Sequence, residues 1–221
     1  MADYLNVVYD KKIRPINTYP GKLIDYLINR YKLEKGLKLL EPGLGRGEFL
    51  LEFKKRGMEC YGVDISSFAG SNLKDINIQT GVDFDKDKLP YEDNFFDIIY
   101  SKSLMEHISN PENFLNEAYR ILKPGGKIIC MIPDWEANYK IYFDDHTHKT
   151  PFTIESLQNI LKICDFNNID VAKFRQLPIT WKYPLINLIS KLVAPFVPVR
   201  TKNKFLRWSR EIMLIGYGEK K

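Results

Sequence analysis

Short apolar runs alternate with amphipathic stretches along most of this chain. Runs typical of strands occupy residues 37–41, 59–64, 76–80, 95–100, 126–132, 168–175 and 211–218. Apolar residues at helical spacing occupy residues 21–32, 47–56, 111–122 and 183–194, and Thr153 with Glu155 opens a further helix. Strands that alternate with helices in this way are typical of a parallel sheet covered by helices. The pattern therefore predicts an α/β fold.

Three glycines follow the first predicted strand on alternate positions. Gly43, Gly45 and Gly47 come directly after Glu41, near the end of that strand. Glycine has no Cβ and tolerates positive φ, so the chain can bend sharply here and its backbone amides can lie close to a ligand. The second strand ends at Asp64, at the distance where an acidic residue binds a ribose in nucleotide-binding folds. The two signals together predict a site for a nucleoside-type ligand.

The loop departs from the fingerprint of dinucleotide-binding proteins. In the pattern G-x-G-x-x-G counted from Gly43, the third glycine falls at Glu48. Glu41 would also lie close to a bound pyrophosphate and repel it. A ligand with a ribose, cationic groups and no phosphate fits better. S-adenosylmethionine is such a ligand, because its sulfonium and ammonium groups suit Glu41 and its ribose diol suits Asp64.

Four segments in order resemble the motifs of class I S-adenosylmethionine-dependent methyltransferases. The first is Glu41 with its glycine loop, and the others are residues 81–100, 101–107 and 120–126. The resemblance covers residues 37–132. It implies a Rossmann-like sheet of seven mostly parallel strands with helices on both faces and an antiparallel last strand. It also implies S-adenosylmethionine as the cofactor and methyl transfer as the reaction.

The resemblance further implies which residues contact the cofactor. Besides the loop and the ribose-binding acid, they are Ile65, Asp83, Phe84 and Ser101. Asp83 would accept a hydrogen bond from the adenine amine, and Phe84 would supply apolar contact. The alternative for this pair is a loop aspartate beside a core phenylalanine. Ligands of open parallel sheets lie beyond the carboxyl ends of the strands, so these polar groups are expected to surround one ligand.

A histidine-containing segment follows the fifth predicted strand. Residues 144–153 resemble an Asp-x-Thr-His segment ahead of a Phe-Thr helix start in small methyltransferases of surface-glycan and lipid modification pathways. A sugar hydroxyl is a poor nucleophile until a base removes its proton, and histidine has a pKa suited to that task. We expect His148 to be the general base, with Asp145 orienting it or the acceptor. His107 is the second candidate, and its alternative is a histidine hydrogen-bonded within a structured loop.

The same segment also allows a metal interpretation. In an extended chain, His146 and His148 could face the same side and share a cation such as zinc or manganese. No further cluster of ligands occurs elsewhere in the sequence, so base catalysis is favoured and no metal is expected. The cysteines are far apart and two lie in predicted strands, which indicates buried free thiols at Cys60, Cys130 and Cys164.

Length and composition fit a single domain. A chain of 221 residues with 44% hydrophobic residues can bury one sizeable core. Residues 1–36 are expected to form a helical lead-in, residues 37–132 the cofactor-binding core, and residues 133–221 the acceptor side. No long apolar run follows a basic start at the N-terminus, so no signal peptide is expected. This predicts a cytoplasmic protein.

The C-terminal part carries most of the positive charge. Residues 173–221 hold eleven Lys or Arg against two Glu, although the net charge of the whole chain is only +5. Residues 183–199 are too short and too interrupted by proline and Lys191 to span a bilayer, yet they have a broad apolar face at helical spacing. Aromatic residues that favour the lipid headgroup region accompany this face at Trp181, Tyr183, Phe196 and Trp208. The pattern fits two interpretations equally, peripheral contact with an anionic membrane and a helix that caps the active site with its apolar face on the core.

Several acceptor classes remain open. A resemblance to glycan-pathway methyltransferases through residues 205–214 favours O-methylation of a hydroxyl on a saccharide or glycolipid. A quinone, polyketide or other small molecule is the second interpretation. A basic, aromatic-rich surface also suits RNA, but no RNA-binding module signature is present, so nucleic acid ranks last among the enzyme interpretations. Outside the enzymes, the alternative is a cofactor-binding protein without catalysis, which the intact loop and His148 argue against.

Overall fold

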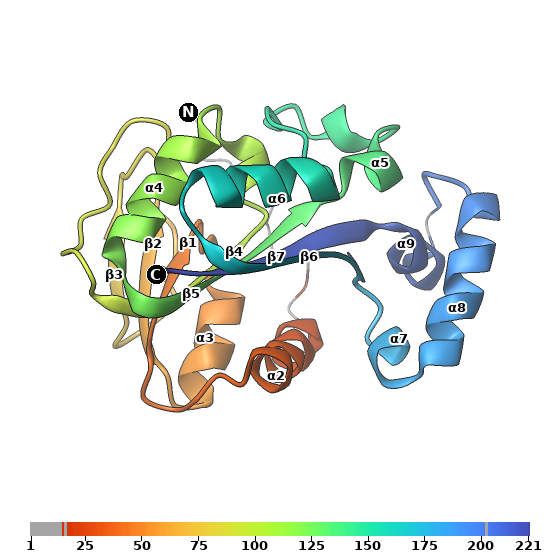
Figure 1. Ribbon diagram of the computed structural model, residues 1–221. Helices are drawn as coiled ribbons and strands as arrows, with labels where there is room; N and C mark the ends of the chain where they lie inside the picture. The colour runs from red at the N-terminus through yellow and green to blue at the C-terminus, as the bar shows by residue number, and fades with distance from the viewer. Residues whose placement is uncertain (1–14, 16, 202) are drawn as a thin grey trace.

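Seven strands form one sheet in the order β3-β2-β1-β4-β5-β7-β6 (Figure 1). The computed structural model describes residues 15, 17–201 and 203–221. The strands are β1 Lys38–Pro42, β2 Glu59–Asp64, β3 Asn77–Thr80, β4 Phe96–Lys102, β5 Leu122–Pro133, β6 Asn167–Arg175 and β7 Ile212–Glu219. The first five pair in parallel, and β7 pairs antiparallel with both β5 and β6. The predicted Rossmann-like sheet with an antiparallel last strand is confirmed.

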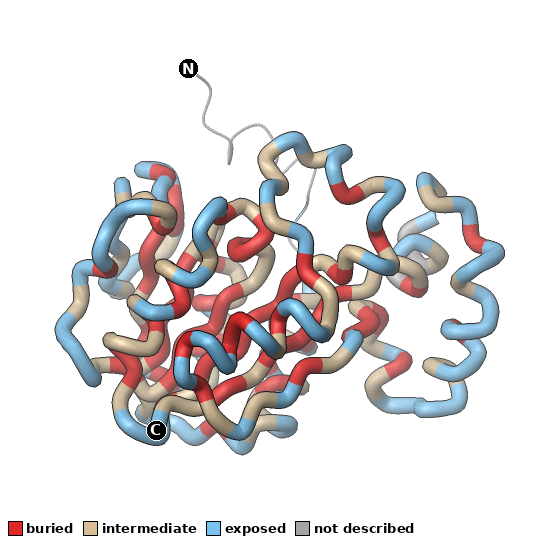
Figure 2. Tube along the Cα trace, turned by 45° about the horizontal axis from the view of Figure 1, so that its top comes forward, coloured by how far each residue is buried: buried red, intermediate tan, exposed pale blue. Residues whose placement is uncertain are grey.

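Helices cover both faces of this sheet, with α2 and α3 on one face and α4 and α6 on the other (Figure 1). The helices are α2 Tyr19–Tyr31, α3 Glu48–Lys55, α4 Pro111–Ile121, α5 Trp135–Asn138, α6 Ile154–Ile163, α7 Ile179–Lys182, α8 Pro184–Val193 and α9 Lys204–Arg210. Short 3-10 turns are η1 Met105–His107, η2 Tyr142–Asp144 and η3 Ala194–Phe196. Apolar helix faces pack on the strands in two clusters, one centred on α2 and α3 and the other on α4 and α6. Figure 2 shows the buried segments running through the sheet.

Local sequence signals account for several helix starts. Thr153 caps α6 as predicted, because its side chain accepts a hydrogen bond from the Ser156 amide at 3.2 Å. Ser156, rather than Glu155, returns the second bond of this capping box. Asn110 caps α4 in the same manner, and Pro111 occupies the first turn, where its missing N–H costs nothing.

Residues 123–126 lie inside β5 as a bulge. Leu122 pairs with Phe96 while Lys127 pairs with Ile98, so the strand register gives no partner on β4 for the intervening residues of β5. Gly125 has a φ of +75°, which glycine adopts without strain. The helix α4 therefore passes into β5 with almost no separate loop.

All three cysteines are buried and free, which confirms the sequence interpretation. Helix α9 was not predicted, and the side chain of Trp208 and all of Lys202 lie outside the described residues. Among the described residues, no helix combines the length and the apolar character needed to cross a membrane.

Candidate active site

The glycine loop joins β1 to α3 at the carboxyl edge of the sheet, where the strand order reverses between β1 and β4. Gly43, Gly45 and Gly47 have φ values of +68°, +52° and +73°. A Cβ at position 47 would lie 2.3 Å from Leu73 Cδ1, and one at position 43 would lie 2.9 Å from Leu104 Cδ1. The loop therefore depends on glycine both for its backbone angles and for its close packing.

Asp64 ends β2 and is buried, and its carboxylate is held by backbone amides. Oδ2 accepts a hydrogen bond from the Gly45 amide at 2.9 Å, and Oδ1 accepts one from the Ser66 amide at 2.9 Å. Ile65 and Phe68 follow it and are 58% and 53% exposed. A fixed carboxylate beside exposed apolar side chains suits a ribose and the base attached to it.

Glu41 lies in β1 and is only 2% exposed. The Leu50 backbone amide donates a hydrogen bond to its carboxylate, but Oε2 is buried with no hydrogen-bond partner among the described residues. Burial raises the pKa of Glu41 well above its usual range, and the charge of Asp64 adds to this effect. A cationic group placed here would satisfy the unpaired oxygen and favour the ionised carboxylate.

The other predicted cofactor residues offer different groups to a ligand. Asp83 follows β3, and its carboxylate pairs with Lys86 Nζ at 3.1 Å. Phe84 is 6% exposed, and its ring packs edge-to-face on Phe114 with centroids 5.7 Å apart. Ser101 is buried in β4. The Phe84 ring belongs to the core, so its backbone is the part available to an adenine, and the role of this pair stays a prediction.

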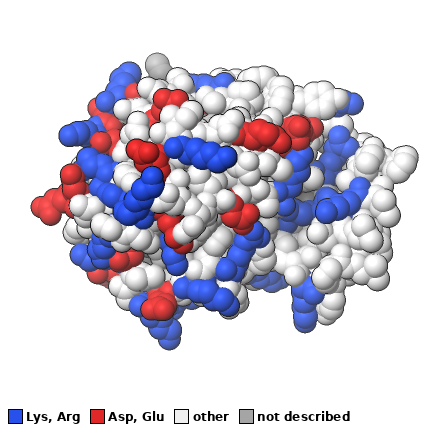
Figure 3. Space-filling view, in the orientation of Figure 1, with Lys and Arg blue, Asp and Glu red and all other residues white. Residues whose placement is uncertain are grey.

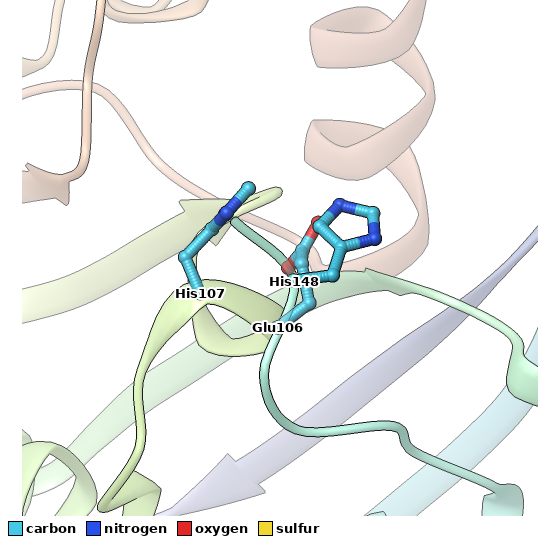
Figure 4. A group of neighbouring side chains, drawn as sticks. All are labelled: Glu106, His107 and His148. Atoms are coloured by element: carbon cyan, nitrogen blue, oxygen red, sulfur yellow. The ribbon is translucent and has the colours of Figure 1, made fainter. Parts of the chain in front are cut away.

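Glu106, His107 and His148 lie side by side, although His148 comes from a different part of the chain (Figure 4). The first two belong to η1 and its end, whereas His148 follows η2. The two imidazole rings have centroids 4.8 Å apart. The Glu106 carbonyl accepts hydrogen bonds from the Lys149 and Thr150 amides at 2.7 and 3.1 Å, which fixes the two segments against each other.

Hydrogen bonds at Nδ1 determine the tautomers of both histidines. His148 Nδ1 lies 2.7 Å from the Tyr142 carbonyl oxygen, and because a carbonyl only accepts, Nδ1 carries the proton. Thr147 Oγ1 donates to Asp145 Oδ1 at 2.6 Å, so at 2.9 Å it accepts from His107 Nδ1. Burial lowers the pKa of His107, and the neighbouring imidazole lowers it further. These contacts place the proton on Nδ1 of each ring and leave Nε2 as the nitrogen that could accept a proton.

The structure thus brings the predicted catalytic residues together, and their roles stay predictions. Asp145 holds Thr147 and, through it, His107, while the Tyr142 carbonyl orients His148. The disfavoured alternative that paired His146 with His148 at a metal is not what the described residues show, because His146 is exposed and His148 lies with Glu106 and His107 instead.

Glu106 was missed by sequence reasoning. It is 1% exposed, and neither carboxylate oxygen has a hydrogen-bond partner of ordinary geometry among the described residues. Burial raises the pKa of Glu106 to about 8, while its own backbone amide and Lys102 oppose the shift. Ligand atoms of Glu106, His107 and His148 lie within 4.8 Å of one another, so these three residues could also hold a metal ion.

Comparisons with known proteins agree with this fold. The profile of the family described as methyltransferase domain matches residues 13–171. Ubiquinone biosynthesis O-methyltransferase of Maricaulis maris is 27% identical over 139 residues, which cover 55% of this chain and 54% of that protein. Phosphoethanolamine N-methyltransferase 3 of Arabidopsis thaliana is 32% identical over 111 residues, covering 46% and 22%. The structure of a SAM-dependent methyltransferase from Archaeoglobus fulgidus is 22% identical, with a TM-score of 0.67 and coverage of 99% and 100%.

The family match covers well over half of the residues, so the chain belongs to the methyltransferase domain family. Its domain is that of a class I S-adenosylmethionine-dependent methyltransferase, and S-adenosylmethionine is its cofactor. The chain spans about half the length of the ubiquinone-pathway relative. The relatives are named for different acceptors, including a quinone and phosphoethanolamine.

Proposed function

We propose that this protein transfers the methyl group of S-adenosylmethionine to a hydroxyl group of a saccharide or glycolipid. The observation that carries the proposal is the Nε2 lone pair of His148, fixed by the Tyr142 carbonyl at the carboxyl edge of the sheet. Bound S-adenosylmethionine supplies the methyl group. His148 takes the hydroxyl proton as the oxygen attacks, which prevents positive charge from building on that oxygen. His107, held by Thr147, lies beside it as a second proton acceptor.

Residues at the ends of the first strands would hold the cofactor in this reaction. We assign the ribose diol to Asp64, whose carboxylate is already oriented by two backbone amides. Glu41 would receive the ammonium group at its unpaired Oε2. Ile65 would cover the adenine, and the loop glycines would let backbone amides approach the ligand. By holding cofactor and acceptor together, these residues would also contribute to the rate through proximity and orientation.

A phenolic hydroxyl of a quinone precursor or polyketide is the second candidate acceptor. The ubiquinone-pathway relative favours it, because that protein is named an O-methyltransferase. The same base would serve either acceptor, since both lose a proton from oxygen. Transfer to a phenol but to no saccharide or glycolipid would select this alternative.

The acceptor side also supports contact with a membrane surface. Apolar side chains at helical spacing on α8 and η3 are more than half exposed, namely Leu185, Leu188, Ile189, Leu192 and Phe196. They do not pack on the core, so the alternative of a core-facing lid is not what the fold shows. Lys182 and Lys191 are exposed on the same part of the chain. We propose that this face lies on an anionic membrane, where apolar side chains and lysines are both satisfied.

Replacing His148 tests the proposed chemistry. His148→Asn should lower the methyl-transfer rate roughly 10²- to 10⁴-fold, the range of general base catalysis, and leave S-adenosylmethionine affinity nearly unchanged. Formation of S-adenosylhomocysteine would be followed with a panel of saccharides, glycolipids and quinone-type phenols. His146→Asn is the matched control, because His146 is exposed and lies only two residues away. A rate within a few-fold of the parent would remove the base role from His148, and cofactor binding without transfer to any acceptor would favour a binding protein.

A further inference from the structure

A basic pocket of about 710 Å³ lies beside the C-terminal end of β6, apart from the glycine loop. Residues of α2, α5, β6, α7, α8 and α9 line it. Its charged lining consists of six cationic side chains, Arg30, Lys140, Lys173, Arg175, Lys191 and Arg210, and one carboxylate, Glu136. Figure 3 shows Lys and Arg side chains gathered in the hollow between the body of the molecule and the α8 side. The pocket therefore has an excess of positive charge.

Two of these cations already have carboxylate partners. Lys173 Nζ lies 3.1 Å from Asp134 and 2.5 Å from Glu136. Arg30 pairs with Asp170 at 2.8 Å. These pairs use the acidic side chain that lines the pocket, Glu136, so the remaining cations have no carboxylate among the described lining residues.

Arg175 is the most unusual of the remaining cations. It is 8% exposed, and Nη1 is buried with no hydrogen-bond partner among the described residues. Its Nε donates only a long bond of 3.3 Å to Asn187 Oδ1, and no ion pair forms within the described part of the chain. A buried guanidinium without a counter-charge is costly, and an anion in the pocket would remove that cost.

Arg210 shows a similar lack of negative partners. Its Nη1 donates to the Ala194 and Val197 carbonyl oxygens at 3.1 and 3.0 Å. These bonds fix the guanidinium and leave its charge without a carboxylate. The guanidinium groups of Arg175 and Arg210 and the exposed Lys191 in one pocket match a phosphate, which accepts several hydrogen bonds and carries negative charge.

One short segment connects this pocket to the histidine cluster. Tyr139 and Lys140 line the pocket. In the same segment, the rings of Trp135 and Tyr142 pack with their centroids 5.1 Å apart, and those of Tyr142 and His148 with their centroids 4.5 Å apart. Residues 135–148 thus form part of the pocket wall and also hold the candidate base. An acceptor anchored in the pocket would extend along this segment.

Helix α8 gives the pocket an apolar border. Asn187 and Lys191 line the pocket, whereas Leu188 and Leu192, one position further along, are 53% and 65% exposed. A phosphate in the pocket and a hydrocarbon chain on the outer face of α8 could therefore belong to one molecule.

We propose that this pocket binds a phosphate group carried by the acceptor, through Arg175, Arg210 and Lys191. This proposal rests on the proposed function in one respect, namely that the phosphate belongs to the methyl acceptor. The phosphate could belong to a phosphorylated saccharide or to a lipid-linked one, since both present the same group to the pocket.

Calorimetry on the full chain without S-adenosylmethionine tests the site. Glycerol phosphate should bind saturably with one site per chain, and Arg175→Gln should weaken it about 10- to 100-fold, as expected for loss of a charge-assisted hydrogen bond. Lys191→Gln, at the exposed edge of the pocket, should weaken it less and carries the test if Arg175→Gln does not fold. Lys162→Gln, exposed on α6, is the control and should change nothing. No saturable binding, or equal binding by the parent and the folded pocket variants, would overturn the proposal.

A second titration distinguishes the source of the phosphate. A short-chain phosphatidylglycerol below its micelle concentration should bind more tightly than glycerol phosphate if the ligand is lipid-linked, and Leu188→Ser should remove the difference. Equal binding would identify a soluble phosphorylated saccharide. S-adenosylmethionine is titrated into the same samples, so cofactor binding without phosphate binding would reject the pocket alone, and the reverse result would reject the methyltransferase function alone.

Discussion

Replacing Glu106 by glutamine tests the electrostatic account of the histidine cluster. Burial raises the pKa of this carboxyl from its ordinary value of 4.5 to about 8 in the folded protein. A group whose pKa is raised on folding contributes stability that is fully present below its unfolded pKa and is lost as the pH rises through its folded pKa. The shift spans roughly three to four pKa units, so the free energy of unfolding should fall by on the order of 3 kcal/mol between pH 5 and pH 8.

Urea denaturation at pH 5, 6, 7 and 8 measures this effect. The amide of Glu106→Gln has no proton to lose in this range, so the difference in stability between parent and variant should change by about 3 kcal/mol, in favour of the variant at high pH. Other titrating groups cancel in the comparison. Glu112→Gln, on the exposed first turn of α4, is the control and should show no such change. The same pH dependence in parent and Glu106→Gln would refute the reasoning, because it would show an ionised carboxylate held by a protonated histidine or a metal ion.

Three further predictions concern the loop, the α8 face and the metal alternative. Gly47→Ala and Gly36→Ala both place a side chain at positive φ, so each should lose about 1–3 kcal/mol of stability in urea denaturation. Only Gly47→Ala, whose Cβ would also clash with Leu73, should weaken cofactor binding in calorimetry. Equal cofactor affinity in the two variants would contradict the loop assignment. The protein should co-sediment with anionic vesicles better than with neutral ones, and high salt should weaken this binding. Leu192→Ser should also weaken it, whereas Ile163→Ser, a change at an equally exposed position on α6, should not. No lipid preference at low salt would reject the membrane proposal. Removing divalent cations with EDTA should leave methyl transfer unchanged, and a loss that zinc or manganese restores would make the histidine cluster a metal site.

The strands and the cofactor loop were predictable because their signals are local. Each apolar run predicted as a strand contains most of the observed strand, and Asp64 ends β2 as its position indicated. Glycine permits the positive φ that a sharp turn needs, so Gly43, Gly45 and Gly47 identified the loop without tertiary information.

The rest of the candidate site depends on which distant segments meet. His107 and His148 were each identified, but their contact arises from hydrogen bonds between η1 and the segment after η2, which sequence spacing does not encode. Glu106 became important through burial, and an acidic residue beside a histidine gives no sign of that. In the sequence, Arg175 belonged to a general basic region. It lines a pocket only because α8 and α9 pack around the end of β6.

Titration of S-adenosylmethionine into the parent protein and Asp64→Ala tests the central claim most directly. The parent should bind S-adenosylmethionine and S-adenosylhomocysteine with no comparable signal for NAD. Asp64→Ala should weaken cofactor binding by about 1.5–3 kcal/mol, the cost of losing hydrogen bonds to a charged group. A thermal melt checks that the variant is folded, because its carboxylate also holds the Gly45 and Ser66 amides. Binding of NAD as tight as that of S-adenosylmethionine, or full cofactor affinity in folded Asp64→Ala, would contradict the account.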